Sequence, residues 1–199
     1  MPVPFRDLDG VRASHRRLLD AIHALTDDQA RQPSLLPGWS KGHVLTHIAR
    51  NADSVTRRLE AAAQDEVVDQ YVGGREGRTA EIEAGAGRSA LQLRADVHES
   101  CAALEAIADR VADAVWDRPV RDISGGLRPA ATMLFARWRE VEVHHTDLGL
   151  GYPPSSWPPE IAETWLPEIV ANLQRRTDAN SLLAWALGRG PAPDLGPWA

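Results

Sequence analysis

The sequence predicts an all-α protein built as a helical bundle. Three observations support this fold class. Apolar residues recur with a period near 3.6 over several long segments, no run alternates apolar and polar residues as a half-buried strand would, and proline and glycine clusters separate the segments. The 199 residues suffice for one substantial core. Four long helices with long connections are typical of a four-helix bundle, in which facing helices often build a metal site.

The helices are expected in a definite order along the chain. They cover residues 7–25, 41–63, 75–84 (short), 89–115 and 129–148, followed by two further segments, 161–176 and 181–187. Asp7 and Ser40 are plausible N-caps, and Pro129 suits the first turn of its helix. Glycines and prolines after residue 148 end the main unit. We therefore expect a bundle over residues 1–150 and a short helical C-terminal extension over 151–199.

Composition excludes several classes of function. The 22 basic and 28 acidic residues give a net charge of −6, and no basic block is present, so nucleic acid is not an expected partner. No run approaches the roughly 20 apolar residues of a membrane helix, and the N-terminus lacks the apolar region of a signal peptide. A cytoplasmic protein is expected. The single cysteine, Cys101, recurs with apolar residues at helical spacing, which indicates a small buried hydrophobe.

A carboxylate and an imidazole lie one turn apart in the fourth long helix. Glu140 and His144 are four residues apart and share a helix face. They supply two of the three protein ligands of a catalytic zinc-type site, so a third must come from another helix. His47, on the apolar face of the segment 41–63, is the candidate. The sequence thus predicts a metal site formed by His47, Glu140 and His144.

Other arrangements compete with this one. Glu142 and His145 have the Glu-x-x-His spacing of di-iron bundles, but that architecture needs a second such motif, which the chain lacks. His43 and His47 could instead be two ligands from one helix. In the simplest alternative the histidines only pack in the core, and Glu140 forms a surface pair with Arg137.

Three separated stretches carry a resemblance to a known family. They are residues 36–53 (LPGWSKGHVLTHIARNAD), 73–87 (GGREGRTAEIEAGAG) and 137–149 (RWREVEVHHTDLG). Together, and in this order, they resemble the mycothiol-dependent maleylpyruvate isomerase family of the DinB-like superfamily. The resemblance covers residues 5–150. It implies a DinB-like four-helix bundle that binds a divalent metal, zinc in the isomerase, through the positions of His47, Glu140 and His144.

The resemblance also implies functional arginines. One follows the second helix and contacts substrate, and Arg78 matches it best, with Arg75 as the alternative. A second lies near the family's C-terminus, and the stretch LLAWALGR at residues 182–189 nominates Arg189. The family has a larger C-terminal domain after its bundle, whereas this chain has only about 50 residues there. The extension is therefore expected to be a truncated remnant of that domain.

The expected function is that of a metal-dependent thiol enzyme. A divalent ion, zinc first and nickel, iron or manganese otherwise, would activate a low-molecular-weight thiol, mycothiol by resemblance, against a small electrophilic substrate. The chain would act as an S-transferase or an isomerase, as a monomer or homodimer. The alternative is a non-catalytic metal-binding bundle that serves as a stress-response or partner-binding module.

Overall fold

The computed structural model describes residues 4–196, which divide into two compact units between Pro154 and Ser155. The elements of the N-terminal unit are α1 (Phe5–Ile22), α2 (Asp27–Arg31), α3 (Lys41–Ala63), α4 (Gly74–Ala86), α5 (Ala90–Arg110), the 3-10 helix η1 (Asp113–Asp117), β1 (Pro119–Arg121), β2 (Leu127–Pro129) and α6 (Thr132–Asp147). The 3-10 helix η2 (Pro154–Ser156) spans the boundary, and the C-terminal unit contains α7 (Pro159–Asn172), the 3-10 helix η3 (Leu173–Arg175) and α8 (Ala179–Ala186).

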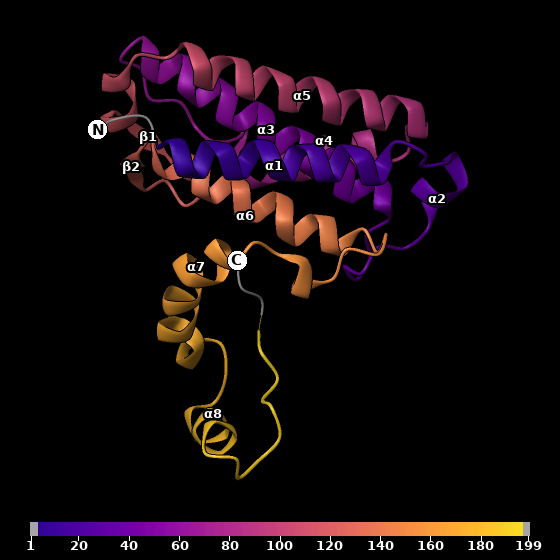
Figure 1. Cartoon of the computed structure of the whole chain (residues 1–199), viewed down its shortest axis with the longest axis vertical. Helices are drawn as coiled ribbons and strands as arrows, with labels where there is room; N and C mark the ends of the chain where they lie inside the picture. The colour runs from indigo at the N-terminus through magenta and orange to yellow at the C-terminus, as the bar shows by residue number, and fades with distance from the viewer. Residues whose placement is uncertain (1–3, 197–199) are drawn as a thin grey trace. The chain divides into compact units, whose positions relative to one another are not determined.

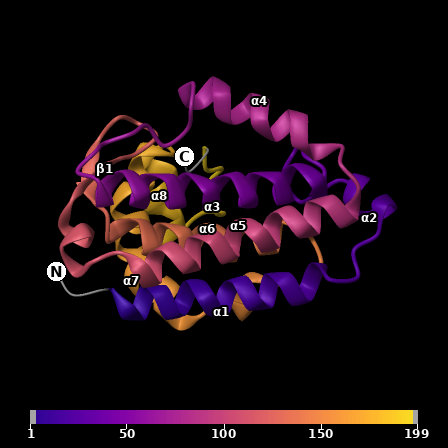
Figure 2. The same cartoon turned by 90° about the horizontal axis from the view of Figure 1, so that it is seen from above.

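Four helices of the N-terminal unit form the expected bundle. Helix α1 packs against α5 and α6, and α3 packs against the same two helices from the other side, so α1, α5, α3 and α6 form a closed ring of four. The long helices run side by side in both views (Figures 1 and 2). The shorter α4 lies outside this ring against α3. The all-α bundle predicted from the sequence is confirmed.

The bundle core is apolar and draws on every helix of the ring. One cluster of this core contains Leu18, Ile22, Leu25, Ala30, Val44, Leu45, Ile48, Ala49, Ala90, Leu93, Val97, Cys101, Val141 and Leu148, all buried. These residues follow the helical period seen in the sequence, since each helix turns one apolar stripe inward. Cys101 is buried with a free thiol, as its spacing predicted.

The start of α3 is fixed by a capping box. The Ser40 side chain accepts a hydrogen bond from the His43 backbone N–H at 3.3 Å, and the His43 ring Nδ1 accepts one from the Ser40 N–H at 3.1 Å. Such reciprocal bonds satisfy two of the N–H groups that a helix start leaves unpaired. Because the cap sets where α3 begins, it also sets the face on which His47 lies, nearly two turns along.

Three local expectations were wrong. Helix α1 begins at Phe5, so Asp7 lies in its first turn rather than at its cap. Pro129 ends a strand and does not open a helix, because residues 119–121 and 127–129 pair as an antiparallel hairpin and α6 begins only at Thr132. Strands of three residues are too short to show an alternating pattern, so apolar periodicity does not predict them. The third long helix ends at Arg110, and a 3-10 turn follows.

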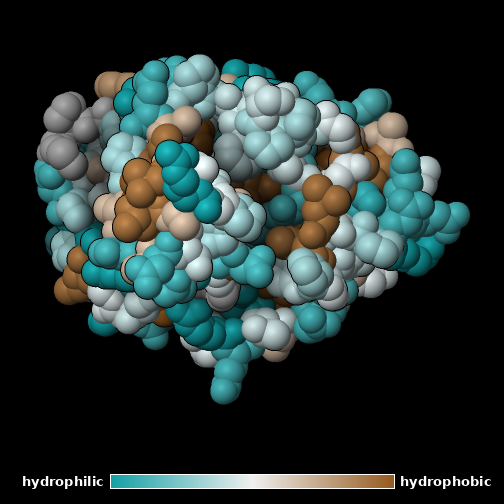
Figure 3. Space-filling view, turned by 90° about the horizontal axis from the view of Figure 1, so that it is seen from below, coloured by the Kyte–Doolittle hydropathy of each residue, from teal (hydrophilic) through white to brown (hydrophobic). Residues whose placement is uncertain are grey.

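The C-terminal unit is helical and keeps several apolar side chains at its own surface. Pro167 lies inside α7, which continues through it. Exposed apolar residues of this unit are Leu166, Val170, Leu183, Trp185, Leu187 and Leu195. In the space-filling view, apolar residues form separate brown patches among hydrophilic ones (Figure 3). None of the helices that the structure describes has the length and apolar character needed to cross a membrane.

The bundle also buries polar groups, among them a histidine with a perturbed pKa. His15 on α1 is 1% exposed, and its Nδ1 lies 2.7 Å from Glu105 Oε1 on α5. Burial lowers the pKa of His15 to about 4; the hydrogen bond to Glu105 opposes this effect and the charge of Arg137 adds to it. His15 is therefore neutral in the folded protein at any pH well above 4.

This pKa predicts how acid destabilises the protein. Unfolding returns the His15 pKa from about 4 to about 6.5, so the unfolded chain binds the extra proton between these values. The His15 contribution is complete above pH 6.5 and is lost as the pH falls towards 4, by about 3 kcal/mol in all. Urea unfolding across this range should show a smaller acid-induced loss in His15→Gln than in the wild type. Equal losses in the two proteins would contradict the assignment.

Candidate metal centre

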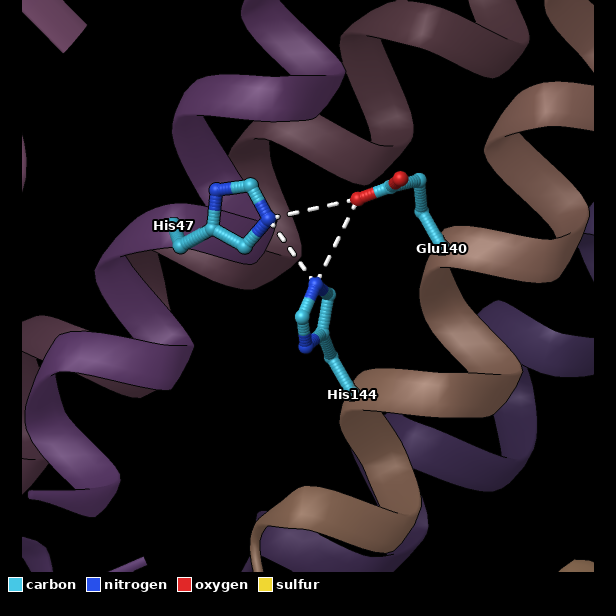
Figure 4. Close-up of side chains that lie close together, drawn as sticks. All are labelled: His47, Glu140 and His144. Carbon is cyan, nitrogen blue, oxygen red and sulfur yellow. Dashed lines mark hydrogen bonds and ion pairs between the residues drawn. The ribbon is translucent and has the colours of Figure 1, made fainter. Parts of the chain in front are cut away.

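The structure brings the three predicted ligands together on one side of the contact between α3 and α6. His47 projects from α3, whereas Glu140 and His144 project from successive turns of α6 (Figure 4). His47 Nε2 lies 3.2 Å from Glu140 Oε2 and 3.0 Å from His144 Nε2. His144 Nε2 lies 3.4 Å from the same Glu140 oxygen. One atom from each side chain thus points at a common centre, and the cluster could hold a metal ion.

The triangle of atoms has the dimensions of a coordination site. Two ligand atoms that each lie about 2.0–2.2 Å from a metal, at angles between a right angle and the tetrahedral value, are separated by roughly 3.0–3.5 Å. The three observed separations, 3.0, 3.2 and 3.4 Å, fall within this range. Two imidazoles and one carboxylate are also a common donor set of catalytic zinc sites. The residues present therefore fit a divalent metal.

Hydrogen bonds alone do not explain this triangle. If both histidines donate from Nε2 to Glu140, two N–H groups face each other across the 3.0 Å between the rings. If His47 Nε2 instead accepts from His144, it has no proton to donate to Glu140. Protons can thus satisfy two of the three contacts but not the third, whereas one cation would satisfy all three. The arrangement favours an ion over a packed hydrogen-bond network.

The pKa values show how the cluster would be charged without an ion. Burial is the largest effect on His47 and lowers its pKa to about 4. Burial also acts to lower the pKa of His144, but hydrogen bonds to Asp147 and Glu140 outweigh it and raise the value to about 9. For Glu140, burial acts to raise the pKa, and the two histidines overcome it and hold the pKa well below the usual range. Near neutral pH a proton on His144 therefore occupies the place that a metal would take.

The outer nitrogen of His144 is held by a carboxylate. His144 Nδ1 lies 2.8 Å from Asp147 Oδ2, three residues along α6. The Asp147 backbone carbonyl in turn accepts a hydrogen bond from the Leu35 N–H at 2.8 Å. A carboxylate on the outer nitrogen of a histidine fixes the ring orientation and makes the other nitrogen a better metal ligand. Asp147 thus directs His144 Nε2 towards the site.

Arg78 reaches the cluster from α4. Its Nη2 lies 3.3 Å from His47 Nδ1, and its guanidinium carbon lies 6.0 Å from the ring centroid of Trp39 and 5.9 Å from that of Tyr71. Two aromatic rings near a guanidinium provide cation–π attraction that helps to keep it in place. Trp39 also packs edge-on against His47, with centroids 5.8 Å apart. The predicted arginine is therefore beside the predicted ligands.

The competing histidines and glutamate have other contacts. His43 uses Nδ1 in the helix cap, and its Nε2 lies 3.4 Å from Glu83. Glu142 is buried and accepts hydrogen bonds from Ser14, Arg17 and Tyr152. His145 stacks on Tyr152 with ring centroids 4.0 Å apart. These residues stabilise the helix start and the segment after α6 and do not join the cluster.

The remaining predicted arginines are exposed side chains. Arg75 is exposed on α4. Arg189 belongs to the C-terminal unit, where its backbone N–H donates to the Ala184 carbonyl at 2.7 Å. Their functional roles stay predictions.

Two features of the site were not predicted from the sequence. Asp147 was part of the quoted motif, and its spacing of three from His144 on one helix could have identified it as a partner of that ring. The aromatic pair beside Arg78 could not be found this way. Trp39 precedes α3 and Tyr71 lies in the connection before α4, and only the fold brings them to one guanidinium.

Comparison with solved structures shows that this fold is shared with a known protein. The crystal structure of the mycothiol-dependent maleylpyruvate isomerase matches with a TM-score of 0.83 and 22% identity, over 98% of this chain and 97% of the other. The structure of a histidine-to-alanine mutant of that isomerase gives the same values. The match extends into the C-terminal unit, and little of the solved chain lies outside it; whether residues 151–199 are a shortened remnant stays a prediction.

The family is established by a separate comparison. No curated protein matches the chain significantly. The family model of the mycothiol maleylpyruvate isomerase N-terminal domain, however, matches residues 11–149, which span the bundle from α1 to the end of α6 and contain all three candidate ligands. The chain therefore belongs to the mycothiol maleylpyruvate isomerase N-terminal domain family.

Proposed function

We propose that this protein is a divalent-metal-dependent enzyme that uses a low-molecular-weight thiol, mycothiol by family, as an isomerase or an S-transferase. The observation that carries the proposal is the convergence of His47, Glu140 and His144 on one centre in a chain of this family. Zinc suits two imidazoles and a carboxylate best, and nickel, iron and manganese are compatible with the same donors.

The metal would be held by His47 Nε2, His144 Nε2 and Glu140 Oε2. Three protein ligands leave coordination positions open, and a divalent ion there lowers the pKa of a bound thiol so that it reacts as the thiolate. The Glu140 side chain is 21% exposed, so the cluster is not sealed from solvent. Asp147 would keep the His144 ring oriented, which preserves the site when the ion leaves or exchanges.

Arg78 would bind the negative charge of the substrate. When His47 binds a metal through Nε2, its Nδ1 carries the ring proton. A guanidinium has only donors, so Arg78 can no longer donate to that nitrogen and is available to another acceptor. A carboxylate, or the enolate that forms when a thiolate adds to an activated double bond, is such an acceptor.

The two reactions differ in what becomes of the adduct. In an isomerase the thiolate adds to the activated double bond, the resulting single bond rotates, and the thiolate leaves, so that thiol is regenerated. In a transferase the carbon–sulfur bond remains and the thiol is consumed. The substrate is a small electrophile in both cases. A cytoplasmic location belongs to this proposal, since a reduced thiol cosubstrate and an unpaired Cys101 both suit a reducing compartment.

Removing one ligand should remove the metal. We expect wild-type protein loaded with zinc and dialysed to retain about one ion per chain, and His47→Ala to retain almost none, because two ligands on one helix hold zinc poorly. Elemental analysis measures the content. His98→Ala, which truncates an exposed histidine of α5, is the matched control and should retain its metal. Equal zinc in His47→Ala and the wild type would refute the ligand assignment.

Asp147 should strengthen metal binding although it is not itself a ligand. Asp147→Ala leaves all three ligands but frees the ring, and loss of such a partner typically weakens metal binding about 10–100-fold. Asp147→Asn should fall between Asp147→Ala and the wild type, because its amide oxygen still accepts a hydrogen bond. Competition with a chromophoric chelator gives the dissociation constants. Asp28→Ala, at an exposed carboxylate, serves as the control, and wild-type affinity in Asp147→Ala would contradict this role.

Thiol chemistry separates an enzyme from a metal-binding module. Metal-loaded protein is incubated with mycothiol and either maleylpyruvate or chlorodinitrobenzene, and both free thiol and the isomeric state of the product are followed. Loss of thiol above the uncatalysed rate indicates a transferase, and cis-to-trans conversion with constant thiol indicates an isomerase. Both activities should vanish in His47→Ala. If neither reaction is accelerated over a broad panel of electrophiles, the protein is a non-catalytic metal-binding module.

A further inference from the structure

A second polar centre lies inside the bundle, organised by Arg137 of α6. The Arg137 side chain is 1% exposed, and its guanidinium donates to groups on the three other helices of the ring. Nε donates to His15 Nε2 on α1 at 3.2 Å, and Nη2 lies 3.4 Å from Cys101 Sγ on α5. Nη1 donates to α3 twice, to the Ile48 carbonyl at 2.8 Å and to Asn51 Oδ1 at 2.9 Å. One side chain therefore joins all four helices.

The charge of this guanidinium is balanced through a neutral imidazole. Because Arg137 Nε donates to His15 Nε2, that nitrogen must be the bare one, and the ring proton is on Nδ1. Nδ1 donates to Glu105, and this hydrogen bond is the main cause that lowers the pKa of the Glu105 carboxyl. A chain of hydrogen bonds thus runs from Arg137 through His15 to an ionised carboxylate on α5, which fixes the orientation of each member.

The Arg137 contacts on α3 lie within one helical turn of the candidate ligand His47. Asn51 follows His47 by four residues on α3, and Arg137 precedes Glu140 by three on α6. From the ligands to this centre, the residue numbers therefore rise on α3 and fall on α6, so the two helices run antiparallel here. The two hydrogen bonds from Nη1 hold α3 and α6 in one register, because sliding one helix along the other would break them.

Burying a guanidinium between helices carries a desolvation penalty that an apolar side chain would avoid. Exchanging a buried charged group and its partners for apolar side chains of similar volume is often neutral or stabilising, and fixing register is the best attested use of such groups. The metal-binding triangle depends on the register between α3 and α6, because sliding one helix by one residue moves its ligand atoms by about 1.5 Å. That displacement is large beside a metal–ligand bond of about 2.1 Å.

We propose that Arg137 is a positioning residue of the metal centre, which holds α3 and α6 in the register that brings His47 to Glu140 and His144. This inference rests on the proposed metal site and extends it to a residue that touches neither metal nor substrate. Asn51 is the acceptor through which Arg137 acts on α3. A merely structural Arg137 would contribute to stability but would leave the metal site of the folded protein unchanged.

The test compares metal binding with global stability in the full-length protein. The variants are Arg137→Met, which keeps the length of the side chain, Arg137→Lys, which keeps its charge, and Asn51→Ala, which removes one acceptor. Leu104→Ala, a truncation of a fully buried side chain of α5, is the matched control for lost stability. Chelator competition gives the zinc dissociation constants, and the visible spectrum of the cobalt-loaded protein reports the geometry of the ligands. Both are measured under conditions in which unfolding measurements show that every variant is folded.

Arg137→Met is expected to bind zinc about 10–100-fold more weakly than the wild type and to shift the cobalt bands, as loss of a group that orients metal ligands does. Arg137→Lys should recover part of the affinity, because an ammonium donates to α3 but cannot reach α1 and α5 with the same planar fork. Asn51→Ala should show a smaller loss of the same kind, whereas Leu104→Ala should keep wild-type affinity and spectrum.

Two results would contradict the positioning role of Arg137. Wild-type zinc affinity and cobalt bands in both Arg137→Met and Asn51→Ala, with stability lowered as in Leu104→Ala, would overturn the positioning role and leave the metal site standing. If Arg137→Met does not fold, Asn51→Ala decides by the same two readouts. A wild-type protein that binds no metal would overturn the metal site itself, and the positioning role with it.

Discussion

The antiparallel contact between α3 and α6 is the constraint on which the candidate site depends. Each helix alone carries an incomplete donor set, one imidazole on α3 and a carboxylate with an imidazole on α6. The three donor atoms lie 3.0–3.4 Å apart only because the two helices meet in one register. The capping box at Ser40 sets the phase of His47 on its helix, and the bonds of Arg137 to Ile48 and Asn51 join the helices at the next turn.

The site combines a rigid interior with an accessible edge. His47 and His144 are buried, and Asp147 orients the His144 ring, so two donors are held in place before an ion arrives. Glu140 is partly exposed, and Arg78 reaches the cluster from α4, which lies outside the four-helix ring. This division would suit an enzyme: the proposed ligands belong to the core, and Arg78, the proposed substrate-binding group, comes from a peripheral helix. A solely structural metal site would have no need of such an arginine.

The bundle contains two buried charged centres, the cluster of candidate ligands and the contacts of Arg137, which differ in how their hydrogen bonds are satisfied. In the cluster of His47, Glu140 and His144, protons satisfy only two of the three contacts, whereas one cation would satisfy all three. Around Arg137, by contrast, each guanidinium nitrogen has at least one acceptor, and hydrogen bonds through the neutral His15 ring link the guanidinium to the Glu105 carboxylate. The first centre is therefore suited to bind an ion and the second to fix the helices. Their separation by a single turn links the core of the fold to its proposed chemistry.

The sequence by itself determined the fold class, the four long helices and the three residues that converge, because helical periodicity and spacings of three and four residues are local properties of a chain. It placed Glu140 and His144 on one face and selected His47 as their partner. Tertiary structure alone decided that Arg137 is buried and that Trp39 and Tyr71 flank Arg78. These features depend on which turns of different helices meet, and such long-range contacts follow from the packing of the whole core rather than from any one segment.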